Sequence, residues 1–274
     1  MTRLAGKIAL VTGGGRGIGL SLVQRLAEEG ARIVINDLDA EPAEAAAKWV
    51  KEAGGEAIAY SGNVTAKDFA AGFIDAALSH FGDIHILVNN AGYVWNGPIH
   101  KIGDAQWDAM QDVHLKAPFR ILRELHGFLE ARVKQERAAG AVFHRKVVNV
   151  SSVAAIGGTA GQVNYSAAKA GLHGLTKSLA KEWGPLAVNI NCVAFGYIDT
   201  RLTQEISGET VVMVEGEARR VGLTRAMIEA IKARIALGRA GTPAEAAGGV
   251  MLFCLPEADY VTGQILEVDG GLAN

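Results

Sequence analysis

The chain has 274 residues, of which 49% are apolar and 20% charged, a composition typical of globular proteins. The formal charge of −2 offers no basic surface to nucleic acid or to a membrane, and no apolar run approaches the roughly 20 residues of a membrane span. The two cysteines, Cys192 and Cys254, lie in apolar runs, so buried thiols are expected rather than a disulfide or a metal site. No signal peptide precedes the first strand pattern, and a cytoplasmic location is expected.

Short β-branched runs alternate with longer helical patterns along the chain. The expected strands are Ile8–Thr12, Arg32–Asn36, Ala57–Tyr60, Ile84–Asn89, Lys146–Val150, Val188–Val193 and Ile265–Val268. The expected helices are Ile18–Glu29, Pro42–Ala53, Asp68–Phe81, Asp104–Ala138, Ser166–Glu182 and Pro243–Leu255. Because parallel strands need crossover helices, this alternation predicts a single α/β domain over residues 1–274, with a doubly wound, Rossmann-like sheet of seven parallel strands in three layers.

Two segments interrupt this alternation. Ala131–Arg145 is charged and lengthens the connection before the fifth strand. Arg201–Leu237 is a long insertion between the sixth and seventh strands, in which a glycine-punctuated stretch precedes a helical pattern from Thr224 to Ala236. Because it follows a strand end at the expected cofactor crevice, the insertion is predicted to form a substrate loop or lid.

A glycine-rich turn, TGGGRGIG, follows the first strand. Such a turn lets the backbone approach a pyrophosphate closely, and the next helix presents free N–H groups and a partial positive charge. Asp37 ends the second strand about twenty residues beyond Gly17, where a carboxylate can bind the adenosine ribose hydroxyls. Because a carboxylate repels a 2′-phosphate, NAD is the predicted cofactor. Arg16 could pair with a 2′-phosphate and keeps NADP possible.

Ser152 follows the fifth strand, and Tyr165 and Lys169 stand four residues apart on the next helix. Positions i and i+4 share a helix face, so the lysine ammonium can lie beside the phenol. A phenol of pKa near 10 is a poor base, but a neighbouring ammonium and an oxidised nicotinamide both favour the phenolate. Ser152 is expected to bind and orient the substrate oxygen. The same spacing also occurs by chance, as a half-buried tyrosine with a surface lysine.

With these motifs, the sequence resembles the short-chain dehydrogenases/reductases over almost its full length. The matching segments are TGGGRGIG (Thr12–Gly19), NNAG (Asn89–Gly92), Ser152, the Tyr165/Lys169 pair and TGQILEVDGG (Thr262–Gly271). The resemblance implies NAD(P)-dependent interconversion of a secondary alcohol and a ketone, with Tyr165 as general acid/base. It also implies that Lys169 binds the nicotinamide ribose and lowers the tyrosine pKa, and that Ser152 binds the substrate oxygen.

The resemblance also implies a set of cofactor contacts and an assembly. Among these contacts, Val64 flanks the adenine, and Ile198 and Thr200 lie near the carboxamide. The full set is Gly13, Arg16, Gly17, Ile18, Gly19, Asp37, Leu38, Asn63, Val64, Asn90, Ala91, Gly92, Tyr165, Lys169, Gly196, Ile198 and Thr200. No metal is expected. The implied assembly is a homotetramer or a homodimer, paired through the long helices before and after the catalytic strand.

The chain departs from the family pattern at three positions. His114 replaces an asparagine in the helix before the catalytic strand, where it is expected either to keep the backbone role or to add a titrating group to the catalytic relay. Asn63 replaces an aspartate, and its amide oxygen can still accept a bond from the adenine amine. Phe195 replaces a proline, which is expected to alter the rigidity of the loop or the pocket wall.

Three functions are therefore weighed. The first is an NAD-dependent oxidoreductase that acts on a small-molecule secondary alcohol or a 3-hydroxyacyl group. The second is an NADPH-dependent 3-oxoacyl thioester reductase, for which Arg16 is the indication. The third is a non-catalytic nicotinamide-binding sensor, against which the presence of Ser152, Tyr165 and Lys169 counts.

Overall fold

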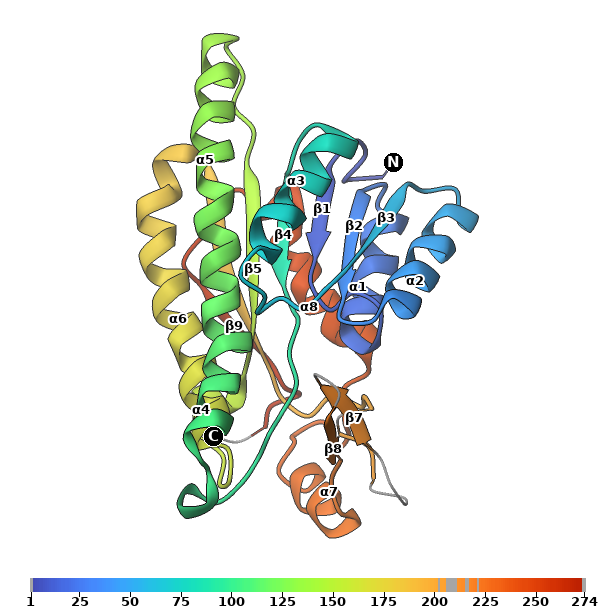
Figure 1. Ribbon diagram of the computed structural model, residues 1–274, viewed down its shortest axis with the longest axis vertical. Coiled ribbons are helices and arrows are strands. Elements are labelled where there is room, and N and C mark those ends of the chain that lie inside the picture. Colours follow the sequence, from blue (N-terminus) through green and yellow to red (C-terminus); the bar gives the residue numbers. More distant parts are fainter. Residues whose placement is uncertain (1, 202, 206–210, 215–216, 221, 273–274) are drawn as a thin grey trace.

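The computed structural model describes residues 2–201, 203–205, 211–214, 217–220 and 222–272. Seven strands form one parallel sheet in the order β3-β2-β1-β4-β5-β6-β9 (Figure 1). Their bounds are β1 Ile8–Val11, β2 Arg32–Asp37, β3 Ala57–Ser61, β4 Ile86–Asn89, β5 Arg145–Ser152, β6 Val188–Phe195 and β9 Ile265–Val268. The predicted doubly wound, seven-stranded parallel sheet is confirmed.

Helices cover both faces of this sheet. Their bounds are α1 Gly17–Glu28, α2 Ala40–Glu52, α3 Phe69–Phe81, α4 Asp104–Gln111, α5 Ala117–Ala138, α6 Val163–Trp183, α7 Arg225–Lys232 and α8 Pro243–Cys254. In β1, Ala9 and Val11 pack with the side chains of α1, α2 and α8, whereas Ile8 and Leu10 pack with those of α3, α5 and α6. Because successive strand residues face opposite layers, burial on both faces explains the uninterrupted apolar strands.

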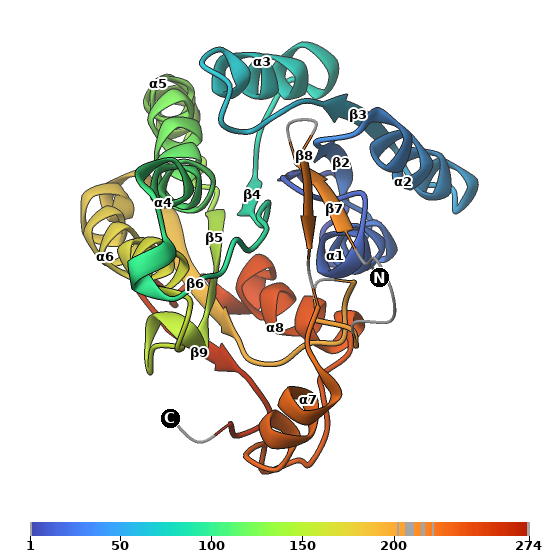
Figure 2. The same ribbon diagram turned by 60° about the horizontal axis from the view of Figure 1, so that its bottom comes forward.

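The direction of winding reverses between β1 and β4, which are neighbours in the sheet. Parallel sheets of this kind bind ligands beyond the carboxyl ends of the strands at such a switch point. The hairpin of β7 (Val211–Val214) and β8 (Glu217–Arg220) and helix α7 lie at that same end (Figures 1 and 2). No strands were predicted here, because both lie in the glycine-punctuated stretch of the insertion. Positions 202, 206–210, 215–216 and 221 of the expected lid lie outside the described residues.

The predicted helix Asp104–Ala138 is not a continuous α-helix. A π-helical turn, Asp112–Lys116, separates α4 from α5 and contains His114. One widened turn changes the direction in which its side chains point, and such turns occur often at functional sites. His114 accordingly faces inward and is 2% exposed.

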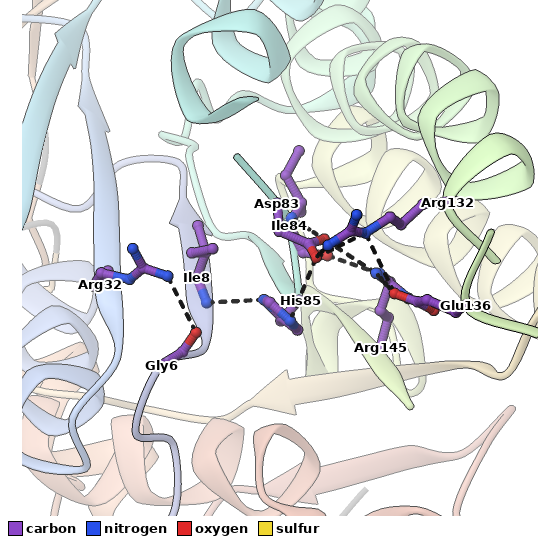
Figure 3. Close-up of polar contacts among 9 residues, drawn as sticks. All are labelled: Gly6, Ile8, Arg32, Asp83, Ile84, His85, Arg132, Glu136 and Arg145. Carbon is purple, nitrogen blue, oxygen red and sulfur yellow. Dashed lines mark hydrogen bonds and ion pairs between the residues drawn. The ribbon is translucent and has the colours of Figure 1, made fainter. Parts of the chain in front are cut away.

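The charged insertion before β5 is anchored by a buried ionic cluster (Figure 3). Arg145, 2% exposed, donates two hydrogen bonds to Glu136 of α5, at 2.7 and 3.0 Å, and one to Asp83 at 3.0 Å. Arg132 of α5 donates to the second oxygen of Asp83 at 2.7 Å. Because buried charges are tolerated only when paired, the cluster fixes the end of α5 against the amino ends of β4 and β5.

Candidate active site

The glycine-rich turn between β1 and α1 leaves no room for larger residues. Gly13 and Gly17 have φ of +64° and +53°, in the left-handed region that favours glycine. A Cβ on Gly19 would lie 1.9 Å from the carbonyl oxygen of Gly13, and one on Gly13 would lie 2.9 Å from Ala91 Cα. Helix α1 begins without a side-chain cap from Arg16, so its first N–H groups can bind a phosphate.

Thr12 joins this turn to the end of β4. Its Oγ1 accepts hydrogen bonds from the backbone N–H groups of Asn90 and Ala91, both at 3.0 Å. The Asn90 side chain donates back to the carbonyls of Thr12 and Gly13, at 2.9 and 3.0 Å. The two segments that were predicted to line the cofactor are therefore held together across the switch point. Sequence analysis did not single out Thr12, although its position between a buried strand and the glycines was a usable signal.

The carboxylate of Asp37 faces the glycine turn at the end of β2 and is largely buried. Its Oδ2 accepts a hydrogen bond from the backbone N–H of Gly15 at 3.1 Å, and its Oδ1 lies 3.5 Å from Arg16 Nη1. The same Nη1 donates to Asp39 at 2.8 Å. The Arg16 guanidinium is therefore paired with two carboxylates.

The remaining predicted adenine contacts lie beside Asp37. Leu38 is 41% exposed, and Val64 is buried. The amide oxygen of Asn63 accepts two hydrogen bonds from Thr65, from its backbone N–H and its hydroxyl, both at 2.9 Å. Since a carbonyl oxygen has two lone pairs, an adenine amine would compete with Thr65 for this oxygen.

The predicted carboxamide contacts reach the other side of the glycine turn. A Cβ on Gly17 would lie 3.9 Å from Thr200 Cγ2. Ile198 is buried, and Ile18 packs against the core on the α1 face. A Cβ on Gly196 would lie 2.6 Å from Asp269 Cβ, so this position also requires a close backbone approach.

Phe195, just before this segment, does not line a pocket. It is the last residue of β6, where it pairs with Ser152 of β5 and Val268 of β9. Its side chain is buried in the core on the face that α1, α2 and α8 cover. The expectation of a pocket wall at Phe195 is therefore wrong, because the strand runs further than predicted and carries the ring into the core.

Ser152, Tyr165 and Lys169 lie together at the carboxyl end of β5. Ser152 ends this strand, and Tyr165 and Lys169 occupy successive turns of α6. The Ser152 hydroxyl lies close enough to the Tyr165 phenol to lower the pKa of that phenol. Lys169 Nζ lies 5.8 Å from the centre of the Tyr165 ring and donates to the carbonyl of Val150 at 2.6 Å. The spacing predicted this arrangement from i and i+4 on one helix face.

Burial affects the two titratable groups in opposite directions. It raises the pKa of the Tyr165 phenol above its usual value, and the Ser152 hydroxyl opposes this rise. It lowers the pKa of the Lys169 ammonium to about 8. Burial therefore disfavours the charged form of each group, although Lys169 still carries its proton near neutral pH, and lowering the phenol pKa requires additional positive charge at the site.

His114 lies against this group. Its ring meets the Tyr165 ring edge to face, with centroids 5.0 Å apart and planes at 89°. Its Nε2 lies 2.7 Å from the carbonyl oxygen of Tyr93, which follows the Asn90–Gly92 segment. The structure thus brings together all four side chains that the sequence proposed for catalysis.

Two kinds of feature, a membrane-spanning helix and a cluster of metal ligands, are absent from the described part of the chain. None of its helices combines the length and the apolar character needed to cross a membrane. Its histidines, cysteines and acidic residues form no group of three or more that suits a metal ion.

The chain is similar to a family of known enzymes and to individual members of it. The family model for short chain dehydrogenase matches residues 7–210. The chain is 34% identical over 270 residues to the 3-oxoacyl-[acyl-carrier-protein] reductase FabG of Thermotoga maritima, covering 98% of this chain and 99% of the relative. It is 35% identical over 266 residues to the short-chain reductase protein NovJ of Streptomyces niveus, covering 96% and 93%. It is 34% identical over 268 residues to the (2S)-[(R)-hydroxy(phenyl)methyl]succinyl-CoA dehydrogenase subunit BbsD of Thauera aromatica, covering 97% and 96%.

Proposed function

Because the chain belongs to the short-chain dehydrogenase/reductase family, as its motifs predict, we propose that it uses NAD to interconvert a secondary alcohol, or a 3-hydroxyacyl group, and the ketone. Membership makes the chain an oxidoreductase that acts on CH–OH or keto groups with a nicotinamide cofactor. The observation that supports the proposed chemistry is the meeting of Ser152, Tyr165 and Lys169 beyond β5, next to the glycine turn.

In the oxidative direction, the Ser152 hydroxyl and the Tyr165 phenolate oxygen orient the substrate hydroxyl. Tyr165, as phenolate, takes the proton of the alcohol while the carbinol carbon loses a hydride. The nicotinamide, when bound, supplies the acceptor for this hydride and its two electrons. In the reductive direction Tyr165 donates the proton to the carbonyl oxygen. The Lys169 ammonium is proposed to hold the nicotinamide ribose and to favour the phenolate.

The decisive variant is Tyr165→Phe, which removes only the hydroxyl. Loss of general acid/base catalysis should lower kcat about 10²- to 10⁴-fold, while NADH binding, followed by fluorescence titration, stays within about twofold. Tyr260→Phe is the matched control because Tyr260 is fully exposed. A Tyr165→Phe enzyme that turns over like the control would remove this residue from the acid/base role.

Two contacts support NAD over NADP. The Asp37 carboxylate can accept bonds from a 2′-hydroxyl and repels a 2′-phosphate, and Arg16 is already paired with Asp37 and Asp39. Asp37→Ala should weaken NAD binding and reduce the preference of the enzyme for NAD over NADP. If the preference does not move in Asp37→Ala but does in Arg16→Ala, then Arg16 selects the cofactor and the NAD assignment is wrong.

A second candidate is the NADPH-dependent reduction of a 3-oxoacyl thioester. It is supported by relatives such as the Thermotoga maritima reductase, whose name specifies a 3-oxoacyl-[acyl-carrier-protein] substrate. Two assays separate the candidates. One measures the oxidation of secondary alcohols and 3-hydroxyacyl thioesters with NAD, and the other measures the reduction of 3-oxoacyl thioesters with NADPH. The sensor alternative is set aside because the family and its named relatives are dehydrogenases and reductases.

We further propose a homotetramer or a homodimer. Helices α4, α5 and α6 carry the exposed apolar side chains Trp107, Phe119 and Val163, which suit an interface. Light scattering should report a mass two or four times that of the chain, and a monomer at working concentration would contradict the proposal. A cytoplasmic location stays a prediction.

We also propose a single domain in which the segment 201–237 acts as a lid. Its hairpin β7–β8 and helix α7 lie at the carboxyl end of the sheet, as the catalytic group does (Figure 2). Limited proteolysis within this segment should slow when NAD and an inhibitor of the alcohol class are both present. Unchanged cleavage would count against a closing lid.

A further inference from the structure

His114 is the one catalytic-site candidate that departs from the family pattern and is buried among the others. The π-helical turn Asp112–Lys116 turns its imidazole inward, where it is 2% exposed. The described neighbours of the imidazole include three on different sides of the ring. They are the carbonyl of Tyr93 at 2.7 Å from Nε2, the α-carbon region of Gly92, and the Tyr165 ring at 5.0 Å between centroids.

The hydrogen bond to Tyr93 determines where the imidazole proton lies. A backbone carbonyl can only accept, so His114 Nε2 must be the donor and must carry a hydrogen. Burial and the nearby Lys169 charge lower the pKa of His114 well below its usual value, while the bond to Tyr93 opposes this. The ring is therefore neutral, and the lone pair stays on Nδ1.

Nδ1 has no side chain or backbone group among the described residues with which to exchange a proton. It is buried and makes no hydrogen bond to any residue that the structure describes. On that side the ring abuts Gly92, where an added Cβ would lie 2.8 Å from Nδ1 and 2.3 Å from Cε1. A proton shuttle needs one nitrogen to take up a proton while the other releases one. Here one nitrogen is held by a carbonyl and the other faces a Cα.

We propose that His114 is a positioning residue. Its Nε2–H, held by the Tyr93 carbonyl, anchors a side chain that packs against Tyr165 and holds it in place, and His114 exchanges no proton during the reaction. This inference rests on the proposed acid/base role of Tyr165. The edge-to-face contact, with planes at 89°, restrains the phenol from the side of α4 and α5. The contact with Gly92 links this restraint to the segment proposed to line the cofactor.

The imidazole thus lies between the segment that follows β4 and Tyr165 of α6, and it contacts both. One side of the ring contacts the segment after β4, through Gly92 and Tyr93, and another contacts Tyr165 of α6. Small misplacements of a reacting group can lower a rate up to about a hundredfold without disturbing the fold. Loss of the ring's anchor should therefore appear in kcat rather than in cofactor binding.

Two substitutions separate positioning from proton transfer. In His114→Gln, the side-chain Nε2 can donate to Tyr93 as the imidazole does, but it cannot titrate. In His114→Leu, both the donor and the titration are lost. Positioning predicts that the Gln variant keeps kcat within about threefold of wild type, whereas the Leu variant falls by about tenfold or more with KM for NAD unchanged. Equal losses in the two variants would show that the bond to Tyr93 does not position the side chain, and would overturn the proposal. So would full activity of the Leu variant.

Nuclear magnetic resonance tests the tautomer without any turnover. In ¹⁵N–¹H long-range correlation spectra, the signals that vanish in His114→Gln belong to His114. They should show the proton on Nε2 and should not move between about pH 5 and about pH 8. A proton on Nδ1, or titration within that range, would overturn the proposal.

The experiments distinguish failure of the proposed acid/base role of Tyr165 from failure of the positioning role of His114. If Tyr165→Phe keeps turnover, the proposed function is wrong whatever the His114 spectra show. If Tyr165→Phe is inactive and the Gln and Leu variants of His114 fail equally, only the positioning role of His114 is wrong.

Discussion

His85 should make the folded chain sensitive to acid. It lies at the end of the sheet opposite the candidate active site, where its Nδ1 accepts a hydrogen bond from the backbone N–H of Ile8 at 3.1 Å (Figure 3). Burial lowers its pKa from 6.5 to about 4. The nearby charges of Lys7 and Arg145 also lower it, while Asp83 and Glu136 raise it. The native state therefore keeps this imidazole neutral when the unfolded chain would protonate it.

The sign and size of the effect follow from this shift. Since the folded-state pKa is the lower one, the neutral imidazole contributes its full stability above about pH 6.5, and this contribution is lost as the pH falls toward 4. A difference of this size corresponds to about 3 kcal/mol in the free energy of unfolding. By about pH 5 the unfolded chain is almost fully protonated at this site, so about 2 kcal/mol is already lost. The side chain is only 13% exposed, so solvent screens the effect little.

Urea denaturation at about pH 7.5 and about pH 5 measures this loss when the wild type is compared with His85→Asn. The asparagine amide oxygen can replace Nδ1 as the acceptor for Ile8 but cannot titrate. The wild type should lose about 2 kcal/mol more than the variant on acidification. His80→Asn, at an exposed position, should behave as wild type. Equal losses in wild type and His85→Asn would refute the assignment.

Two further variants test the packing of the site and of the ionic cluster. Gly19→Ala should weaken NADH affinity by roughly tenfold or more in calorimetric titration, because its Cβ has no space in the turn. Gly248→Ala, which meets no atom within 4 Å, should bind normally. Arg145→Met leaves Glu136 buried without its main partner and should cost about 3–5 kcal/mol in urea denaturation. Lys48→Met, which removes an exposed pair, should cost about 0.5 kcal/mol or less.

The sheet and the catalytic group were predictable from local signals. Apolar strands separated by helical patterns can pack in few ways, and parallel strands place their carboxyl ends at one edge. Ser152 at a strand end and Tyr165 and Lys169 four residues apart on a helix therefore had to meet. The glycine turn was equally predictable, because Gly13 and Gly17 adopt backbone angles that other residues avoid.

Features that depend on distant partners were not predictable. Arg132 and Glu136 could be placed on one helix face, but their partners Asp83 and Arg145 come from two other elements. The charged insertion was therefore expected to be only a longer connection, whereas it supplies buried ion pairs. The π-helical turn has no sequence signal of its own, since its register is set by what His114 contacts.

The short strands β7 and β8 were missed for a related reason. Each has four residues, and among the described strands each pairs only with the other, so neither gives the long apolar run that identified the sheet strands. A hairpin of this length depends on packing against its surroundings.

The opposite effects of burial on Tyr165 and Lys169 bear on the direction of catalysis. A neutral phenol is the correct proton donor for reducing a ketone, whereas oxidising an alcohol requires the phenolate. Burial raises the pKa of Tyr165 and lowers that of Lys169 to about 8, so the chain alone favours the state suited to reduction. An oxidised nicotinamide carries a positive charge that its reduced form lacks, and positive charge lowers a phenol pKa. The alcohol-oxidising rate should therefore rise with pH and the ketone-reducing rate should fall as the phenol loses its proton. The midpoint of the rise should lie at lower pH than the midpoint of the fall.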